Sequence, residues 1–120
     1  MKVELRKKFR FEAAHRLPKM PEGHKCRRLH GHSFSVEIAV EGECDPDLDI
    51  LIDYADISLA FKPILEILDH NYLNEIEGLE NPTSENIAAW IWQKLKPVLP
   101  HLKEIIIEET CTSRCVYRGE

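Results

Sequence analysis

The chain has 120 residues, of which 43% are hydrophobic and 31% are charged, a composition typical of one globular domain. Its formal net charge of −5 argues against a duplex nucleic-acid-binding protein, which normally presents a basic surface. The basic segment 1–8 is not followed by an apolar run, and no segment approaches the length of a membrane span. We therefore expect a single domain over residues 1–120 of a soluble, cytoplasmic protein with no membrane or nucleic-acid partner.

Two segments near the N-terminus alternate apolar and polar residues with the period of a strand. The odd positions are mostly apolar from residue 3 to 15, and the even positions are apolar from residue 34 to 40. This alternation predicts two strands, 3–15 and 30–40, each with one solvated face. The intervening segment 18–28 is too long for a tight hairpin, and we interpret it as a functional loop.

Two helices are predicted in the middle of the chain. Apolar residues recur at helical spacing over 57–68, after Asp53 and Asp56 as candidate caps. A second helix is expected to begin at Thr83 or Ser84 and to run as far as residue 100. The apolar stripe of this second helix is predicted to consist of Ile87, Trp90, Ile91, Leu95 and Val98.

The C-terminal segment supplies two more predicted strands, a long one over 102–110 and a short one over 116–118. The order of elements is then two strands, two helices and two strands, which is an α+β domain. An antiparallel four-stranded sheet with both helices on one face satisfies these patterns. Its two edges would stay open, so we expect edges of neighbouring subunits to pair and to form an oligomeric barrel.

Three histidines, His15, His30 and His32, form a candidate metal site. They continue the apolar faces of the first two predicted strands, because residues two apart on a strand point to the same side. A lone histidine at such a position is more often a core residue, but three together would leave several ring nitrogens unpaired without a cation. Three neutral nitrogen ligands with an open fourth position are typical of a catalytic Zn²⁺. His24 and His101 lack such neighbours and are predicted to be surface residues.

Cys26 stands four residues before His30 and is flanked by Lys25, Arg27 and Arg28. The local positive field favours the thiolate, which predicts a base or nucleophile beside the metal. The alternative is an inert loop thiol with solvated neighbours. The same three cations are also candidate contacts for substrate phosphates.

Acidic residues offer two further candidates. Asp69 and His70 end the first predicted helix, where His70 is either favoured by the helix dipole or acts as a proton relay oriented by Asp69; the sequence leaves both open. One carboxylate of the strand 102–110 is expected to turn inward, the candidates being Glu104, Glu108 and Glu109. Glu109 shares the apolar face of that strand, and a planar guanidine-like ligand edge would fit its two oxygens.

Six segments together closely resemble the 6-pyruvoyl-tetrahydropterin synthase family, and the resemblance runs over nearly the whole chain. The segments are Phe11–Pro18, Glu22–Cys26, Arg28–His32, Asp69–Asn74, Asn81–Glu85 and Glu109–Thr112. Within the family, the spacing of Cys26 from the two following histidines resembles the branch that serves queuosine biosynthesis.

The resemblance implies a tunnelling fold, in which subunits join as trimers into a barrel and two trimers stack into a homohexamer. It also implies that a neighbouring subunit contributes to each site. The implied zinc ligands are His15, His30 and His32, and the implied catalytic base is Cys26. Asp69 and His70 are implied to form a proton relay. Glu109, with Thr83 and Ser84, is implied to anchor the pterin.

The activity implied by the resemblance is the conversion of 7,8-dihydroneopterin triphosphate to 6-carboxy-5,6,7,8-tetrahydropterin, acetaldehyde and triphosphate. Two alternatives stay open. One is a sister activity on related pterins, either elimination to the 6-pyruvoyl compound or aldolase cleavage of the side chain. The other is a non-catalytic, zinc-stabilised oligomer that binds a pterin or a purine.

Overall fold

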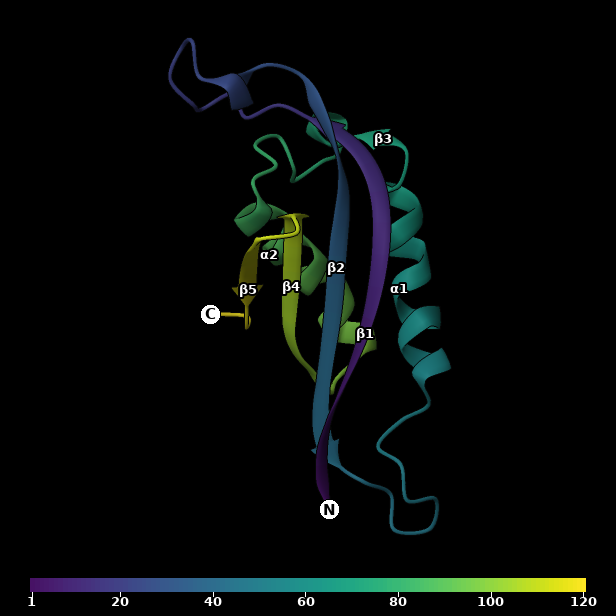
Figure 1. Ribbon diagram of the computed structural model, residues 1–120. Helices are drawn as coiled ribbons and strands as arrows, with labels where there is room; N and C mark the ends of the chain where they lie inside the picture. The colour runs from purple at the N-terminus through teal and green to yellow at the C-terminus, as the bar shows by residue number, and fades with distance from the viewer.

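A computed structural model describes residues 1–120 as a long, curved sheet with two helices on one of its faces (Figure 1). None of the helices is both long enough and apolar enough to span a membrane. The strands are β1 (Lys2–His15), β2 (His30–Glu43), β3 (Asn71–Tyr72), β4 (Leu102–Thr110) and β5 (Ser113–Tyr117). The helices are α1 (Tyr54–Leu68) and α2 (Ser84–Leu95), and the short 3₁₀ turns are η1 (Lys25–Arg27), η2 (Leu73–Glu75) and η3 (Lys96–Val98).

The sheet has the strand order β3-β1-β2-β4-β5. The four longer strands pair antiparallel, which confirms the predicted four-stranded antiparallel arrangement and the α+β class. The fifth strand, β3, was not predicted; it pairs parallel to β1 through only two residue pairs, Ala13 with Asn71 and Ala14 with Tyr72. Two residues are too few to show a periodicity, so no local pattern indicates this strand.

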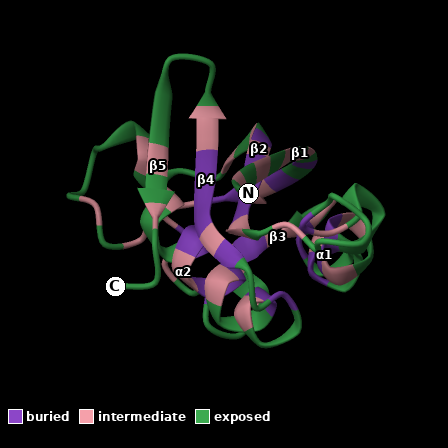
Figure 2. Ribbon diagram, turned by 90° about the horizontal axis from the view of Figure 1, so that it is seen from below, coloured by how far each residue is buried: buried purple, intermediate pink, exposed green.

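The hydrophobic core lies between the sheet and the helices, and Figure 2 shows buried residues along β4 and on the side of α2 beneath it. On the sheet, Phe11 of β1 stacks on Phe34 of β2 with ring centroids 4.9 Å apart. The even positions of β2 from Phe34 to Val40 are fully buried, as the alternation predicted. The buried residues of α1 are Ile57, Phe61, Ile64 and Leu68.

The helix termini follow the predicted capping with one correction. Asp53 caps α1 by accepting a hydrogen bond from the Ala55 amide at 2.8 Å. The second helix ends at Leu95 and not near residue 100, because Pro97 has no amide hydrogen to continue the helical hydrogen bonds. Val98 consequently lies in η3 and is 61% exposed, so its predicted place on the apolar stripe was wrong.

The sheet face away from the helices is polar, and Glu104 is its most buried charged group. Its carboxylate accepts hydrogen bonds from Arg6 of β1 and, at 2.9 Å, from Nε of Arg118. Burial alone would raise the pKa of Glu104, but the two guanidinium groups outweigh it and hold the pKa below its ordinary value. Among the three glutamates considered for β4, Glu104 is therefore the one buried on this polar face.

The functional side chains gather at one end of the molecule. There β1 ends, β2 begins, and the connecting loop projects beyond the sheet (Figure 1). The register of β1 and β2 places His15 directly opposite His30, and Ala13 opposite His32. All three histidines therefore belong to the core side of the sheet at its end.

Candidate active site

The three histidines predicted to bind a metal form a compact group. Their ring centroids lie 4.6 Å apart for His15 and His30, 5.2 Å for His15 and His32, and 4.9 Å for His30 and His32. Each histidine offers one ring nitrogen as a ligand atom, and these three nitrogens all lie within 4.8 Å of one another. This separation suits three ligands that surround one ion.

The hydrogen bonds of two rings show that this group fits a metal. Nδ1 of His15 lies 2.9 Å from the Pro82 carbonyl oxygen, and Nδ1 of His30 lies 2.7 Å from the Arg28 carbonyl oxygen. A carbonyl oxygen only accepts, so each Nδ1 donates its hydrogen and each Nε2 keeps a free lone pair. Backbone carbonyls commonly orient metal-binding histidines in this way.

His15 strengthens this conclusion. Its ring is fully buried, and its Nε2 has no hydrogen-bond partner. Burial lowers the pKa of His15, which keeps the imidazole neutral as a metal ligand requires. An orphaned nitrogen of this kind is costly unless something binds to it.

Glu109, at the end of β4, is the carboxylate that approaches the histidines. Its Oε2 lies 3.8 Å from Nε2 of His32, and its Oε1 accepts a hydrogen bond of 2.8 Å from the Ser84 hydroxyl. Ser84 is the first residue of α2, and Thr83 caps that helix by accepting a bond from the Asn86 amide. The hydroxyl of Thr83 is thus engaged within the helix terminus, whereas that of Ser84 fixes the carboxylate.

Glu109 borders two cavities. A cavity of about 440 Å³ on the side of α2 is lined by Ser84, Glu85, Ile107, Glu109, Thr110, Ser113, Arg114 and Cys115. A second cavity, of about 250 Å³, is lined by Lys8, Arg10, Ser33, Ser35, Glu108, Glu109, Thr110 and Cys111. A ligand in either cavity would meet the Glu109 carboxylate within reach of the histidine group.

Asp69 and His70 are held firmly against the edge of β1. The Glu12 amide donates to Oδ1 of Asp69 at 2.9 Å, and the His70 amide donates to the Glu12 carbonyl. His70 adopts a left-handed backbone (φ 59°), and its Nδ1 lies 2.9 Å from Oδ2 of Asp69. The bond from the Glu12 amide, with the contribution of His70, lowers the pKa of Asp69 and keeps it ionised. Asp69 therefore orients the His70 ring, the geometry that a relay requires.

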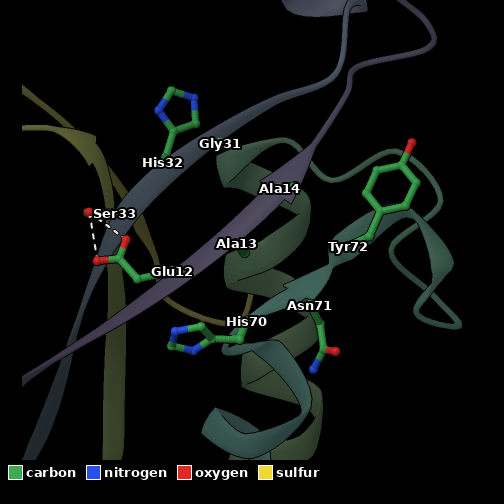
Figure 3. Close-up of a pocket in the computed structure, with 9 residues that line it drawn as sticks. All are labelled: Glu12, Ala13, Ala14, Gly31, His32, Ser33, His70, Asn71 and Tyr72. Atoms are coloured by element: carbon green, nitrogen blue, oxygen red, sulfur yellow. Dashed lines mark hydrogen bonds between the residues drawn. The ribbon is translucent and has the colours of Figure 1, made fainter.

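The His70 ring is 77% exposed and lines the largest cavity, of about 590 Å³. Figure 3 shows His70 among the lining residues, together with the Ser33 hydroxyl, which donates to the Glu12 carboxylate at 2.8 Å. Other lining residues are Ala13, Ala14, Gly31, His32, Asn71 and Tyr72. The presence of Glu12 and Ser33 in the lining of this cavity was not predicted, because the alternation of apolar and polar residues placed both only on a solvated strand face.

Cys26 lies in η1 and is half-buried. Its thiol is outside the group of possible metal ligands, no hydrogen bond joins it to His70, and the cavity that His70 lines does not include it. Its backbone is well fixed, since its carbonyl accepts from Leu17 and its amide donates to Nδ1 of His24 at 3.1 Å. His24 is exposed, as predicted, yet it caps the turn that carries the cysteine. Within one chain the thiol and the predicted relay are not brought together.

Comparison with known proteins identifies the family of the chain. The family model described as 6-pyruvoyl tetrahydropterin synthase matches residues 4–120. The chain belongs to the 6-pyruvoyl tetrahydropterin synthase family. Over 117 residues it is 44% identical to a 6-carboxy-5,6,7,8-tetrahydropterin synthase of Synechocystis sp., covering 92% of this chain and 89% of that protein.

Two further relatives show the range of the family. A dihydroneopterin monophosphate aldolase of Pyrococcus furiosus is 37% identical over 100 residues, covering 83% of this chain and 81% of the relative. The solved structure of Caenorhabditis elegans 6-pyruvoyl tetrahydropterin synthase superposes with a TM-score of 0.92 at 29% identity, over 100% of this chain and 97% of that one. The superposition confirms the tunnelling fold of the subunit, and the relatives support enzymatic activity on a pterin.

Proposed function

We propose that this protein is a zinc-dependent 6-carboxytetrahydropterin synthase. It would convert 7,8-dihydroneopterin triphosphate and one water molecule to 6-carboxy-5,6,7,8-tetrahydropterin, with release of acetaldehyde and triphosphate. The 44% identity to the Synechocystis protein of that name, over 92% of this chain, carries the choice of reaction. The partly buried histidine group beside Glu109 supports the chemistry. In this proposal the product serves queuosine biosynthesis in the cytoplasm.

The metal would be held by His15, His30 and His32. When bound, Zn²⁺ supplies a Lewis acid that stabilises negative charge on oxygens of the substrate side chain. The chain contributes the conditions for this site, because the carbonyls of Pro82 and Arg28 fix two of the rings.

Glu109 would anchor the pterin. The guanidine-like edge of a pterin offers two donors, and the two oxygens of a carboxylate accept them side by side. The Ser84 hydroxyl holds one of these oxygens and thereby sets the plane of the carboxylate. Thr83 would act indirectly. It caps α2, whose first residue, Ser84, donates to the Glu109 carboxylate.

Cys26 and His70 would move the protons. As a thiolate, Cys26 would remove a proton from a side-chain carbon, and His70, oriented by Asp69, would return one on the opposite side. The two groups do not meet within one chain. We therefore propose that a neighbouring subunit completes each site in a homohexamer built as a dimer of trimers.

The sheet has two open edges that support such an assembly. The outer edge of β5 has no partner strand, and β3 covers β1 only at residues 13 and 14. Pairing of these edges between subunits would satisfy the exposed backbone groups. It would also bring the exposed His70 ring against a neighbouring chain.

The co-products of the reaction test this proposal against the sister activities. The proposed reaction releases acetaldehyde and triphosphate in equal amounts. The similarity to the Pyrococcus furiosus aldolase favours one specific rival, which would cleave the side chain without releasing triphosphate. Elimination to the 6-pyruvoyl compound would release triphosphate without acetaldehyde. If the substrate is recovered unchanged while zinc and the pterin both bind, the protein is a binding protein.

A further inference from the structure

The loop that joins β1 and β2, residues 16–29, is strongly basic although the chain as a whole is acidic. It contains five of the 16 lysine and arginine residues and a single carboxylate. It projects beyond the end of the sheet (Figure 1). Like charges in a short exposed segment repel one another, so a defined loop conformation needs compensating contacts.

Arg27 provides such contacts. Its Nη1 donates to the carbonyl oxygens of Pro18 at 3.0 Å and of Met20 at 2.9 Å. The guanidinium thus links the second limb of the loop, residues 24–29, to the first limb, residues 16–20. Its positive charge also lies among carbonyl dipoles, which makes both bonds charge-assisted.

The backbone around Arg27 is tied to the same limb. The Leu17 amide donates to the Cys26 carbonyl at 2.8 Å, and Nη1 of Arg16 lies 3.5 Å from the Arg27 carbonyl oxygen. Leu17 is itself buried in the core. The limb that Arg27 contacts is therefore fixed to the rest of the protein. Cys26, next to Arg27, is held by its own carbonyl bond to Leu17.

The other exposed cations of the loop behave differently. The side chains of Lys19, Lys25 and Arg28 form no hydrogen bond and no ion pair within the chain. Arg27 is thus the one cation among the three that flank Cys26 whose side chain is occupied internally. The internal bonds of its Nη1 distinguish Arg27 from Lys25 and Arg28.

We propose that Arg27 is a positioning residue for Cys26. Its guanidinium joins the two limbs of the loop and so holds the thiol in place relative to the histidine group. This inference rests on the role proposed above for Cys26 as the base. Of the three cations that flank Cys26, it leaves Lys25 and Arg28, and not Arg27, to receive the anionic end of the substrate.

The test compares three full-length variants, Arg27→Met, Arg27→Lys and Lys19→Met. Lys19→Met is the matched control, because it removes an equal charge from the same loop without removing a hydrogen bond. Backbone hydrogen exchange is followed by mass spectrometry in peptides covering residues 16–28. The strand β4 serves as the internal reference for an intact fold, because it is paired with β2 and largely buried.

Arg27→Met is expected to speed exchange of the Leu17 and Cys26 amides by about tenfold or more, with no change in β4. In the same variant kcat should fall by about tenfold or more while KM changes less than about twofold, because the base is misplaced and the substrate contacts remain. Arg27→Lys should keep most of the protection, since both bonds come from one nitrogen. Lys19→Met should exchange and turn over like the wild type.

Two results would overturn the proposal. One is an Arg27→Met protein with unchanged exchange over 16–28. The other is a raised KM with unchanged kcat, which would make Arg27 a substrate contact. The exchange measurement requires no turnover, so it stands even if Cys26→Ala proves active and the proposed reaction mechanism fails.

Discussion

His15→Ala is expected to remove a metal-dependent increment in stability. The wild-type ring is fully buried, and its Nε2 lacks a partner, a condition that costs about 1–3 kcal/mol. An ion that binds only the folded protein relieves this cost as part of its binding free energy. At a free-ion concentration about 1,000-fold above Kd it raises the free energy of unfolding by about 4 kcal/mol. With one of three ligands removed, we expect an increment below about 1 kcal/mol.

The assay is urea unfolding followed by the fluorescence of Trp90 and Trp92, with chelator or with added zinc, at one protein concentration. The increment produced by zinc is compared between variants, because His15→Ala also loses the bond to Pro82 and with it some metal-free stability. His101→Ala is the control, since His101 is an exposed histidine outside the group. Equal increments in wild type and His15→Ala, or none in the wild type, would refute the reasoning.

Three further predictions concern single substitutions. Cys26→Ala is expected to keep its zinc by elemental analysis and to lose turnover; full turnover would exclude the thiol from the mechanism. Ser84→Ala should raise KM for the pterin by about tenfold because the Glu109 carboxylate loses its fixed plane, and Ser84→Thr should restore it; an unchanged KM would contradict this role. Glu104→Gln should cost about 1.5 kcal/mol at neutral pH. The pKa of Glu104 is lowered in the folded protein, so its contribution to the free energy of unfolding is present above about pH 4.5 and is lost as the pH falls through the folded-state pKa. Urea unfolding of the variant should therefore lack this part of the acid sensitivity over that pH range.

The strands and the histidine group could be predicted because one face of the sheet is buried. Burial on one side imposes a period of two, and this period fixed which residues of β1 and β2 point inward. His15, His30 and His32 continue that pattern, so their common face followed from sequence alone. The pairing of His15 with His30 agrees with this expectation.

Contacts made by backbone groups could not be predicted. The Pro82 carbonyl meets His15 across 67 positions of sequence, and every residue carries the same carbonyl group. The pairing of β3 with β1 and the hydrogen bond from the Glu12 amide to Asp69 are also made by backbone groups. These contacts depend on tertiary placement, which local patterns do not record.

The relation of Cys26 to His70 shows a second limit. Their residue types predicted a base and a relay, but residue types do not specify distance. The structure supports orientation of His70 by Asp69 and leaves the thiol elsewhere in the chain. Their joint action therefore belongs to the proposed assembly of subunits and is not seen within one chain.

The most direct test of the proposed function is the mass of the pterin product formed when the zinc-loaded protein meets 7,8-dihydroneopterin triphosphate. We predict 6-carboxy-5,6,7,8-tetrahydropterin as the product, with no product from the metal-free protein. A 6-pyruvoyl or aldehyde pterin would contradict the proposed reaction while leaving the family and the site in place, and recovery of unchanged substrate would contradict enzymatic activity on this pterin altogether.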